Sequence, residues 1–200
     1  MSNQRAPLAL RQTEYPPCNT DVRVVCVEIT DILGTEKVNK RNEPYVVDEV
    51  VFSYQLDALM KDGKSSFVLD KKFTRVVSSG NELGKWFQSW SGSPSLLTDE
   101  QLQIWIDAFA DNSLIGCNGL GKPTMQTTVG GFPWCNLREI RPLPKGMEKI
   151  TGTSDYVPYT ERQRRKEEAR NQRSGGLPPA SSAPPTPPTL SGKEEFSGQF

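Results

Sequence analysis

The residues best suited to chemistry in this sequence form a stripe of alternating aromatic and basic side chains. One parity of the segment 67–77 (FVLDKKFTRVV) carries Phe67, Leu69, Lys71, Phe73 and Arg75. Alternate side chains of an extended strand share a face, so these rings and cations would lie together. Single-stranded nucleic acid is held by such surfaces, because bases stack on rings and phosphates meet cations. The alternative is that these rings belong to the core and the two cations lie at its edge.

Four further residues extend the predicted surface. Tyr54 lies on the preceding predicted strand, Lys72 follows Lys71, and Lys40 belongs to the basic loop 37–41 (KVNKR). Trp134 follows a tight glycine turn, where an aromatic ring is harder to explain as core than one on a helix. Core packing of Trp134 and a plain connector at 37–41 are the alternatives. The predicted DNA-binding residues are Lys40, Tyr54, Phe67, Lys71, Lys72, Phe73, Arg75 and Trp134.

The composition argues against most catalytic chemistry. The chain has no histidine, which excludes Ser-His-Asp and Cys-His sites and any zinc site that uses histidine. Acidic residues are scattered singly, so we expect no enzyme, no metal site and no cofactor; a carboxylate cluster in a cleft would revive an enzyme. The 24 basic residues balance the 24 acidic ones, so any nucleic-acid binding depends on a local stripe and not on bulk charge.

The cysteines and the apolar segments indicate in which cellular compartment the protein is expected. Four cysteines without a C-x-x-C pair predict reduced, partly buried thiols: Cys18, Cys26, Cys117 and Cys135. No segment approaches the ~20 apolar residues of a membrane span, and the first residues lack a signal peptide's apolar run. We therefore expect a cytoplasmic protein with no membrane partner.

The order of predicted elements indicates the fold. Period-2 alternation predicts strands at 22–33, 45–56 and 67–77, and Asp62-Gly63 predicts the hairpin between the last two. Capping boxes at 79–82 and 98–101 begin two amphipathic helices, and strands follow at 123–129 and 133–141. The glycine run 116–122 lacks the spacing of a phosphate-binding loop and is predicted as a connector before the fourth strand.

Three strands, a helical insertion and two strands are the element order of an OB fold. We therefore predict a mainly β (α+β) protein, a five-stranded OB-fold-like Greek-key barrel with its helices between the third and fourth strands. A generic α+β sandwich is the alternative.

The composition changes after this core. We divide the chain into an N-terminal arm (1–19), the core (20–147), a charged spacer (148–173), a Pro-rich linker (174–192) and a terminal tip (193–200). Residues 160–173 predict a solvated helix, with a basic nucleic-acid arm as the alternative. Six of the nineteen linker residues are proline, so we expect the C-terminal tail to be disordered.

The tip, KEEFSGQF, combines acids with two phenylalanines. It predicts a docking peptide whose rings enter a partner's pocket while its carboxylates meet a basic rim. The alternative is a random chain end. The partner-binding residues of this prediction are Glu194, Glu195, Phe196 and Phe200.

The segments VRVVCVEITDILGT, KKFTRVV, WFQSWSG and NLREIRPLPKG, within residues 20–147, resemble phage- and prophage-encoded single-stranded-DNA-binding proteins of the OB-fold type. Bacterial single-stranded-DNA-binding proteins are similar in layout, with an OB core, a flexible linker and an acidic tip ending in Phe. The tip here departs from that pattern, because Lys193 cancels one of its charges.

The resemblance implies a non-enzymatic protein that coats single-stranded DNA in phage replication or recombination, in the host cytoplasm. It also implies replication or recombination proteins as partners of the tip. A phage protein-protein interaction or inhibitor module, with an OB-like barrel and no nucleic-acid affinity, is the alternative. The sequence leaves open the oligomeric state and the preference between DNA and RNA.

Overall fold

The computed structural model describes residues 14–128, 130–131 and 133–173. The chain divides into two units, residues 1–161 and 162–200. The elements are β1 (Val22–Val38), β2 (Pro44–Leu59), β3 (Ser66–Thr74), α1 (Glu82–Ser91), α2 (Asp99–Ala110), β4 (Asn118–Thr127), β5 (Pro133–Pro142) and α3 (Tyr159–Arg173). The predicted order of strands and helices is confirmed. The predicted linker and tip, with Glu194, Glu195, Phe196 and Phe200, lie outside the described residues.

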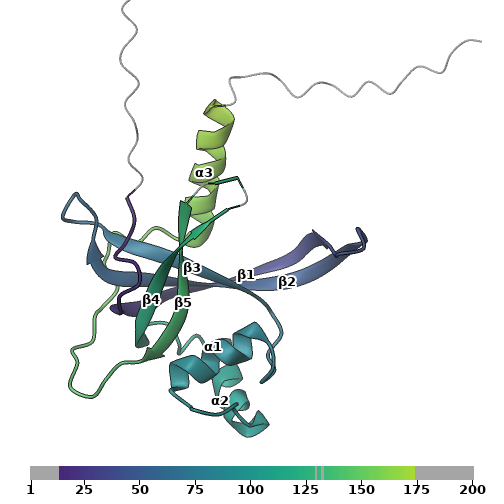
Figure 1. The fold of residues 1–200 in the computed structure, drawn as a ribbon, viewed down its shortest axis with the longest axis vertical. Coiled ribbons are helices and arrows are strands. Elements are labelled where there is room, and N and C mark those ends of the chain that lie inside the picture. Colours follow the sequence, from purple (N-terminus) through teal and green to yellow (C-terminus); the bar gives the residue numbers. More distant parts are fainter. Residues whose placement is uncertain (1–13, 129, 132, 174–200) are drawn as a thin grey trace, which may run out of the picture. The chain divides into compact units, whose positions relative to one another are not determined.

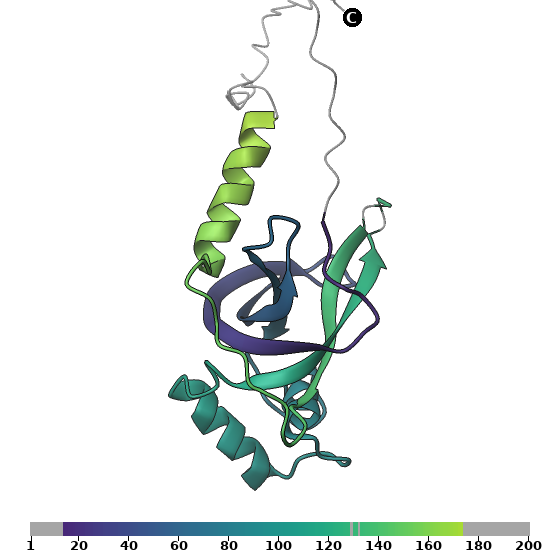
Figure 2. The same ribbon diagram turned by 90° about the vertical axis from the view of Figure 1, so that its left-hand side faces the viewer.

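The five strands form one antiparallel sheet in the order β3-β2-β1-β4-β5 (Figure 1). Among the described residues no ladder joins β3 to β5, so the sheet is open. Two breaks in the β1–β2 register, one after Cys26 and one after Ile32, accompany the strong bend of β1 (Figure 2). Such irregularities bend a strand and increase its twist.

A two-stranded arm extends from this sheet (Figure 1). β1 pairs with β4 over residues 22–25, and β2 begins to pair with β3 at Glu49, whereas the β1–β2 ladder continues to Val38 and Pro44. We call residues 32–48 the β1–β2 arm. At its turn the Asn39 side chain accepts hydrogen bonds from the amides of Arg41 and Glu43, at 2.8 and 3.0 Å. This closes the turn.

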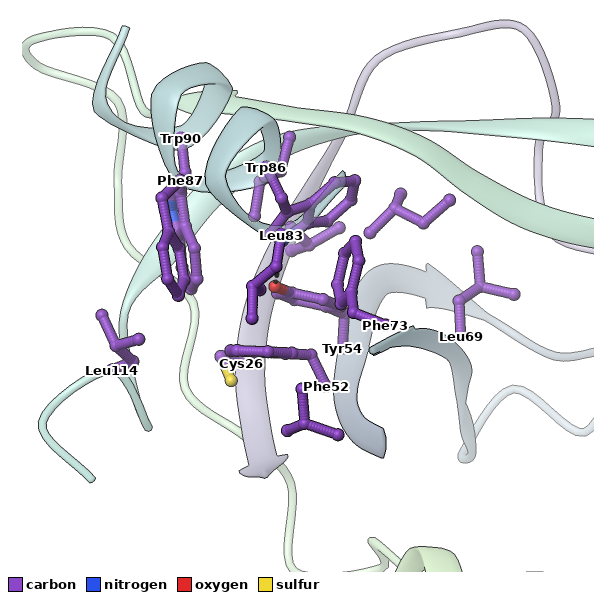
Figure 3. Close-up of a cluster of buried hydrophobic side chains, with 14 of the residues drawn as sticks. Cys26, Phe52, Tyr54, Leu69, Phe73, Leu83, Trp86, Phe87, Trp90 and Leu114 are labelled. Atoms are coloured by element: carbon purple, nitrogen blue, oxygen red, sulfur yellow. Dashed lines mark hydrogen bonds between the residues drawn. The ribbon is translucent and has the colours of Figure 1, made fainter. Parts of the chain in front are cut away.

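Helix α1 packs against β5 and β3, near the two ends of the strand order. Its predicted apolar stripe is buried: Leu83, Trp86, Phe87 and Trp90. Figure 3 shows these helix side chains facing aromatic rings of the sheet. The Trp86 indole donates a hydrogen bond of 2.8 Å to the Tyr54 hydroxyl, so the polar ends of both buried rings are satisfied. Helix α2 buries less, with Leu102 its one fully buried residue.

The two helix starts differ from each other in how well the sequence predicts them. The capping box at Thr98 and Gln101 is confirmed at the start of α2. The box predicted at 79–82 is wrong, because Asn81 and not Ser79 is the N-cap of α1 and accepts a 2.8 Å hydrogen bond from the Gly84 amide. Asn and Ser are about equally good caps, so the pattern alone did not choose between them.

The glycine run before Pro123 is strand and not the predicted connector, because β4 begins at Asn118. A Cβ on Gly119 would lie 2.8 Å from the Arg141 carbonyl oxygen, and one on Gly121 would lie 2.7 Å from a Leu137 methyl carbon. Both distances are shorter than real contacts allow. Glycine at these positions therefore lets β4 approach β5 closely.

Helix α3 matches the helix predicted at 160–173. It is polar along its length, and Arg164 and Glu168 form an i,i+4 ion pair of 2.6 Å. Such exposed pairs contribute a few tenths of a kcal/mol each. In the part of the chain that the structure describes, no helix is both long enough and apolar enough to cross a bilayer.

Candidate nucleic-acid interface

The aromatic residues of the β3 stripe lie in the core. Phe67 and Phe73 are 6 % and 3 % exposed, and Tyr54 on β2 is fully buried (Figure 3). The prediction that these three rings stack on bases is therefore wrong, and the alternative core role is the observed one. Burying a large ring contributes about 1.5–3 kcal/mol. Because the sheet packs on one apolar core, the face of β3 that carries the aromatic side chains turns toward that core.

The predicted cations on and just after β3 separate into two groups. Lys72 pairs with Glu49 and Arg75 pairs with Asp31, each at 2.9 Å. Lys71 is half-buried, and its ammonium lies 5.4 Å from the centre of the Trp86 ring and 5.7 Å from that of Phe73. Burial lowers the pKa of the Lys71 ammonium. Lys40 lies exposed in the turn of the β1–β2 arm.

A buried carboxylate joins the β1–β2 arm to β3. The Glu49 side chain is 3 % exposed and lies 2.6 Å from the Lys37 ammonium and 2.9 Å from that of Lys72. Burial alone would raise the pKa of this carboxyl, but the hydrogen bonds from the two lysines hold it below its ordinary value. A carboxyl of this kind stabilises the fold above its unfolded pKa, and the contribution is lost as the pH falls through its folded pKa.

We expect Glu49→Gln to lower the free energy of unfolding by about 1–3 kcal/mol near neutral pH, because it removes two charge-assisted hydrogen bonds. In acid, below the lowered folded pKa of Glu49, the wild-type carboxyl also protonates, so the difference should shrink. Urea unfolding at the two pH values measures both effects. Glu36→Gln, at an exposed position of the same arm, is the control. An equal loss in both variants, or a difference that persists in acid, would contradict the role given to Glu49.

The outer face of β1 and β2 is partly covered by the chain itself. The Gln55 side chain, 3 % exposed, accepts a 2.7 Å hydrogen bond from the Thr153 amide and donates to the Thr153 hydroxyl. Glu28 accepts hydrogen bonds from the Tyr156 hydroxyl and from the Tyr159 amide. Residues 150–159 thus occupy part of the outer surface of β1 and β2.

A cleft of about 220 Å³ lies where α1 meets β3 and β5. Three of its side chains are basic and two are acidic. Its floor includes the ring of Trp86, and Lys71 lies over that ring. The lining residues are Lys71, Phe73, Glu82, Lys85, Trp86, Ser89, Arg138 and Glu139.

The β4–β5 hairpin carries the second half of the candidate site. Trp134 is 43 % exposed and lies opposite Gln126, while Thr124 lies opposite Asn136. These side chains alternate with the buried Leu137, and Lys122 and Arg138 follow next to them, at a register shift of the β4–β5 ladder. Residues 122–138 contain no aspartate or glutamate. We call this surface the hairpin face; its residues are Lys122, Thr124, Gln126, Trp134, Asn136 and Arg138.

Arg138 belongs to both the hairpin face and the cleft. Of the residues predicted from the sequence, Lys71 and Phe73 line the cleft, and Trp134 lies on β5, the strand that supplies Arg138 to it. Lys40, Lys72 and Arg75 are on or beside the β1–β2 arm, and the last two are already ion-paired. Sequence reasoning missed Lys85, Lys122 and Arg138. The absence of acidic residues from 122–138 is the sequence feature that could have identified Lys122 and Arg138.

Comparison of the chain with protein-family models, with curated proteins and with solved structures returned no match. Among the described residues, no three acidic or cysteine side chains gather in a way that could hold a metal ion.

Proposed function

We propose that this protein binds single-stranded DNA through the hairpin face and the adjoining cleft. The observation that carries the proposal is the exposed Trp134 in the acid-free stretch 122–138, whose last residue, Arg138, also lines a cleft with Lys71 and Lys85. A base stacked on an exposed ring contributes ~1–3 kcal/mol, and neighbouring cations neutralise the phosphates on either side. No bond is made or broken, so the proposed protein is a coating protein and not an enzyme.

An OB fold is part of the proposal. Two features support it: β1 pairs with both β2 and β4, and a helix between β3 and β4 packs near the gap between β3 and β5. OB folds bind oligonucleotides through the loops between strands 1 and 2 and between strands 4 and 5. Of these two loops the proposed site uses the β4–β5 hairpin, and the turn of the β1–β2 arm, with Lys40, lies outside it. The outer face of β2 is not part of the proposed site, because Thr153 hydrogen-bonds to Gln55 there.

The proposed biological role is to coat DNA exposed during phage replication or recombination. The terminal tip would recruit replication or recombination proteins, and binding to the site above does not depend on it.

Tryptophan fluorescence tests the binding site directly. Trp86 and Trp90 are 4 % and 5 % exposed and Trp105 is half-buried, so Trp134 is the tryptophan most open to a bound base. We expect an oligothymidylate to quench the emission, with an affinity that falls steeply between about 50 and about 200 mM salt. The Trp134→Phe variant should fold normally and lose most of the quenching. No binding, or an affinity without salt dependence, would overturn the proposal.

A protein-interaction module is the second candidate, favoured by an apolar groove of about 460 Å³ between α1 and the end of α2. Its apolar walls include Leu83, Ile106 and Phe109, and Arg75 lies at its rim. Grooves of this kind accept apolar side chains of a partner. This candidate predicts no oligonucleotide affinity at either salt concentration, so the titration above separates the two.

A further inference from the structure

The segment before β1 brings a cysteine to the inner side of β5. The Tyr15 hydroxyl donates a 3.1 Å hydrogen bond to the Pro133 carbonyl, and the Asn19 amide donates one of 2.7 Å to the Pro123 carbonyl. These two contacts lie on either side of Cys18 in the sequence, so they hold it against the β4–β5 hairpin.

The Cys18 thiol lies directly against the thiol of Cys135. Their sulfur atoms are 3.4 Å apart, and both side chains are half-buried. A disulfide bond is about 2.05 Å long, so closing it requires the two sulfurs to approach by about 1.4 Å. Rotation of the two cysteine side chains can supply this movement, because the segment that carries Cys18 is anchored but has no regular secondary structure.

The other two cysteines provide an internal comparison. The Cys26 amide donates to the Cys117 carbonyl at 3.0 Å, so these residues are also neighbours, just beyond the end of the β1–β4 ladder. Their thiols point to different acceptors, however, the Glu28 carbonyl for Cys26 and the Ser113 carbonyl for Cys117. Backbone proximity alone therefore does not produce a thiol pair, and the contact at Cys18 and Cys135 is specific.

We propose that Cys18 and Cys135 are an oxidation site that forms an intramolecular disulfide with a disulfide oxidant such as oxidised glutathione. In the first exchange the Cys18 sulfur attacks glutathione disulfide, which gives a mixed disulfide and releases one glutathione thiol that carries the Cys18 proton. In the second exchange the Cys135 sulfur attacks Cys18 and the second glutathione thiol leaves with the Cys135 proton. Two protein thiols are oxidised, and one glutathione disulfide is reduced to two thiols.

The order of the two exchanges follows from the environment of Cys135. Burial, reinforced by the hydrogen bond with Cys18, raises the pKa of the Cys135 thiol to about 12. Thiolate and not thiol is the attacking species, so Cys135 is a poor first nucleophile toward a dissolved oxidant. It can still complete the second exchange, because it already lies in contact with the sulfur that it attacks.

The disulfide would join residues 117 positions apart in the chain. A cross-link that closes so long a loop constrains the unfolded chain strongly. We expect the melting temperature to rise by roughly 5–15 °C on oxidation. Trp134 lies on the opposite side of β5 from Cys135, so quenching by oligothymidylate should be unchanged. Failure of the oxidation proposal would therefore leave the proposed DNA site untouched, and failure of the DNA-binding proposal would leave the oxidation site untouched.

The test is thiol mapping of the full chain after incubation with oxidised glutathione. Free thiols are alkylated during unfolding in denaturant without reductant, and peptides are identified by mass spectrometry. We expect one peptide pair linked through Cys18 and Cys135, with Cys26 and Cys117 alkylated. Either Cys135→Ser or Cys18→Ser should remove the link and the rise in melting temperature, whereas Cys117→Ser should keep both.

Three results would overturn the inference. Alkylation of both Cys18 and Cys135 after prolonged oxidation would show that the pair does not close. A different pairing, within or between chains, would show that another thiol reacts first. An equal rise in melting temperature in Cys18→Ser or in Cys135→Ser would show that the stabilisation has another source.

Discussion

Replacing Trp134 with alanine should weaken oligothymidylate binding by about 5- to 150-fold, which corresponds to the loss of one base stack of ~1–3 kcal/mol. The fold should be unaffected, because the ring is 43 % exposed and its neighbour Cys135, not Trp134, faces the core. Fluorescence anisotropy of a labelled oligonucleotide measures the affinity. The salt dependence should persist, since the cations remain in place.

Tyr45→Ala is the matched control for this experiment. Tyr45 is 44 % exposed and lies on the β1–β2 arm, away from the hairpin face. We expect its removal to change the affinity by less than about twofold, because a surface mutation outside the site removes no stack. Equal losses in the two variants would show that no particular ring is used. A loss confined to Tyr45→Ala would move the site to the arm.

The fold of this chain could largely be predicted from local patterns. Alternation placed the strands, and the helical spacing of Trp86, Phe87 and Trp90 placed α1 and its buried face. Both depend on the apolar pattern of single segments, which the sequence records directly. The glycines of β4 could not be recognised in this way, because the reason for Gly121 lies in its contact with Leu137 on another strand.

The candidate site could be predicted only in part. Alternation in β3 divides its residues into two faces but does not say which face is buried, and the stripe that holds Phe73 and Lys71 turned inward. Trp134 was identified correctly as exposed because it follows a turn. Arg138 and Lys85 come together through the packing of α1 on β5, which no local pattern in either segment records.

The sequence also could not predict that residues 150–159 cover part of the outer surface of β1 and β2. Residues 148–173 read as a uniform charged spacer, yet Thr153 and Tyr156 make specific hydrogen bonds to Gln55 and Glu28. These partners are about 100 or more positions away in the chain. Polar residues in an irregular segment give no periodic signal, so contacts of this kind depend on the assembled fold.

The largest effect on stability is expected for Gly84→Ala, in the first turn of α1. A Cβ on Gly84 would overlap the carbonyl oxygen of Ser78, which is backbone and belongs to the turn that supplies the Asn81 cap. Alanine normally favours a helix over glycine by about 1 kcal/mol. Here that gain is far smaller than the cost of forcing the turn away from the helix, because overpacking alone costs about 1–3 kcal/mol and more where backbone must move.

We therefore expect Gly84→Ala to lower the free energy of unfolding by about 3 kcal/mol or more, measured by urea unfolding followed through tryptophan fluorescence. Gly80→Ala, where a Cβ would meet nothing within 4 Å, should stay within about 0.5 kcal/mol of the parent. Because α1 also positions Lys85 and Trp86, any Gly84→Ala protein that remains folded should bind oligothymidylate less tightly than Gly80→Ala. Equal unfolding midpoints in the two variants would show that the turn at Ser78 yields easily, and that α1 is not held where the candidate cleft requires it.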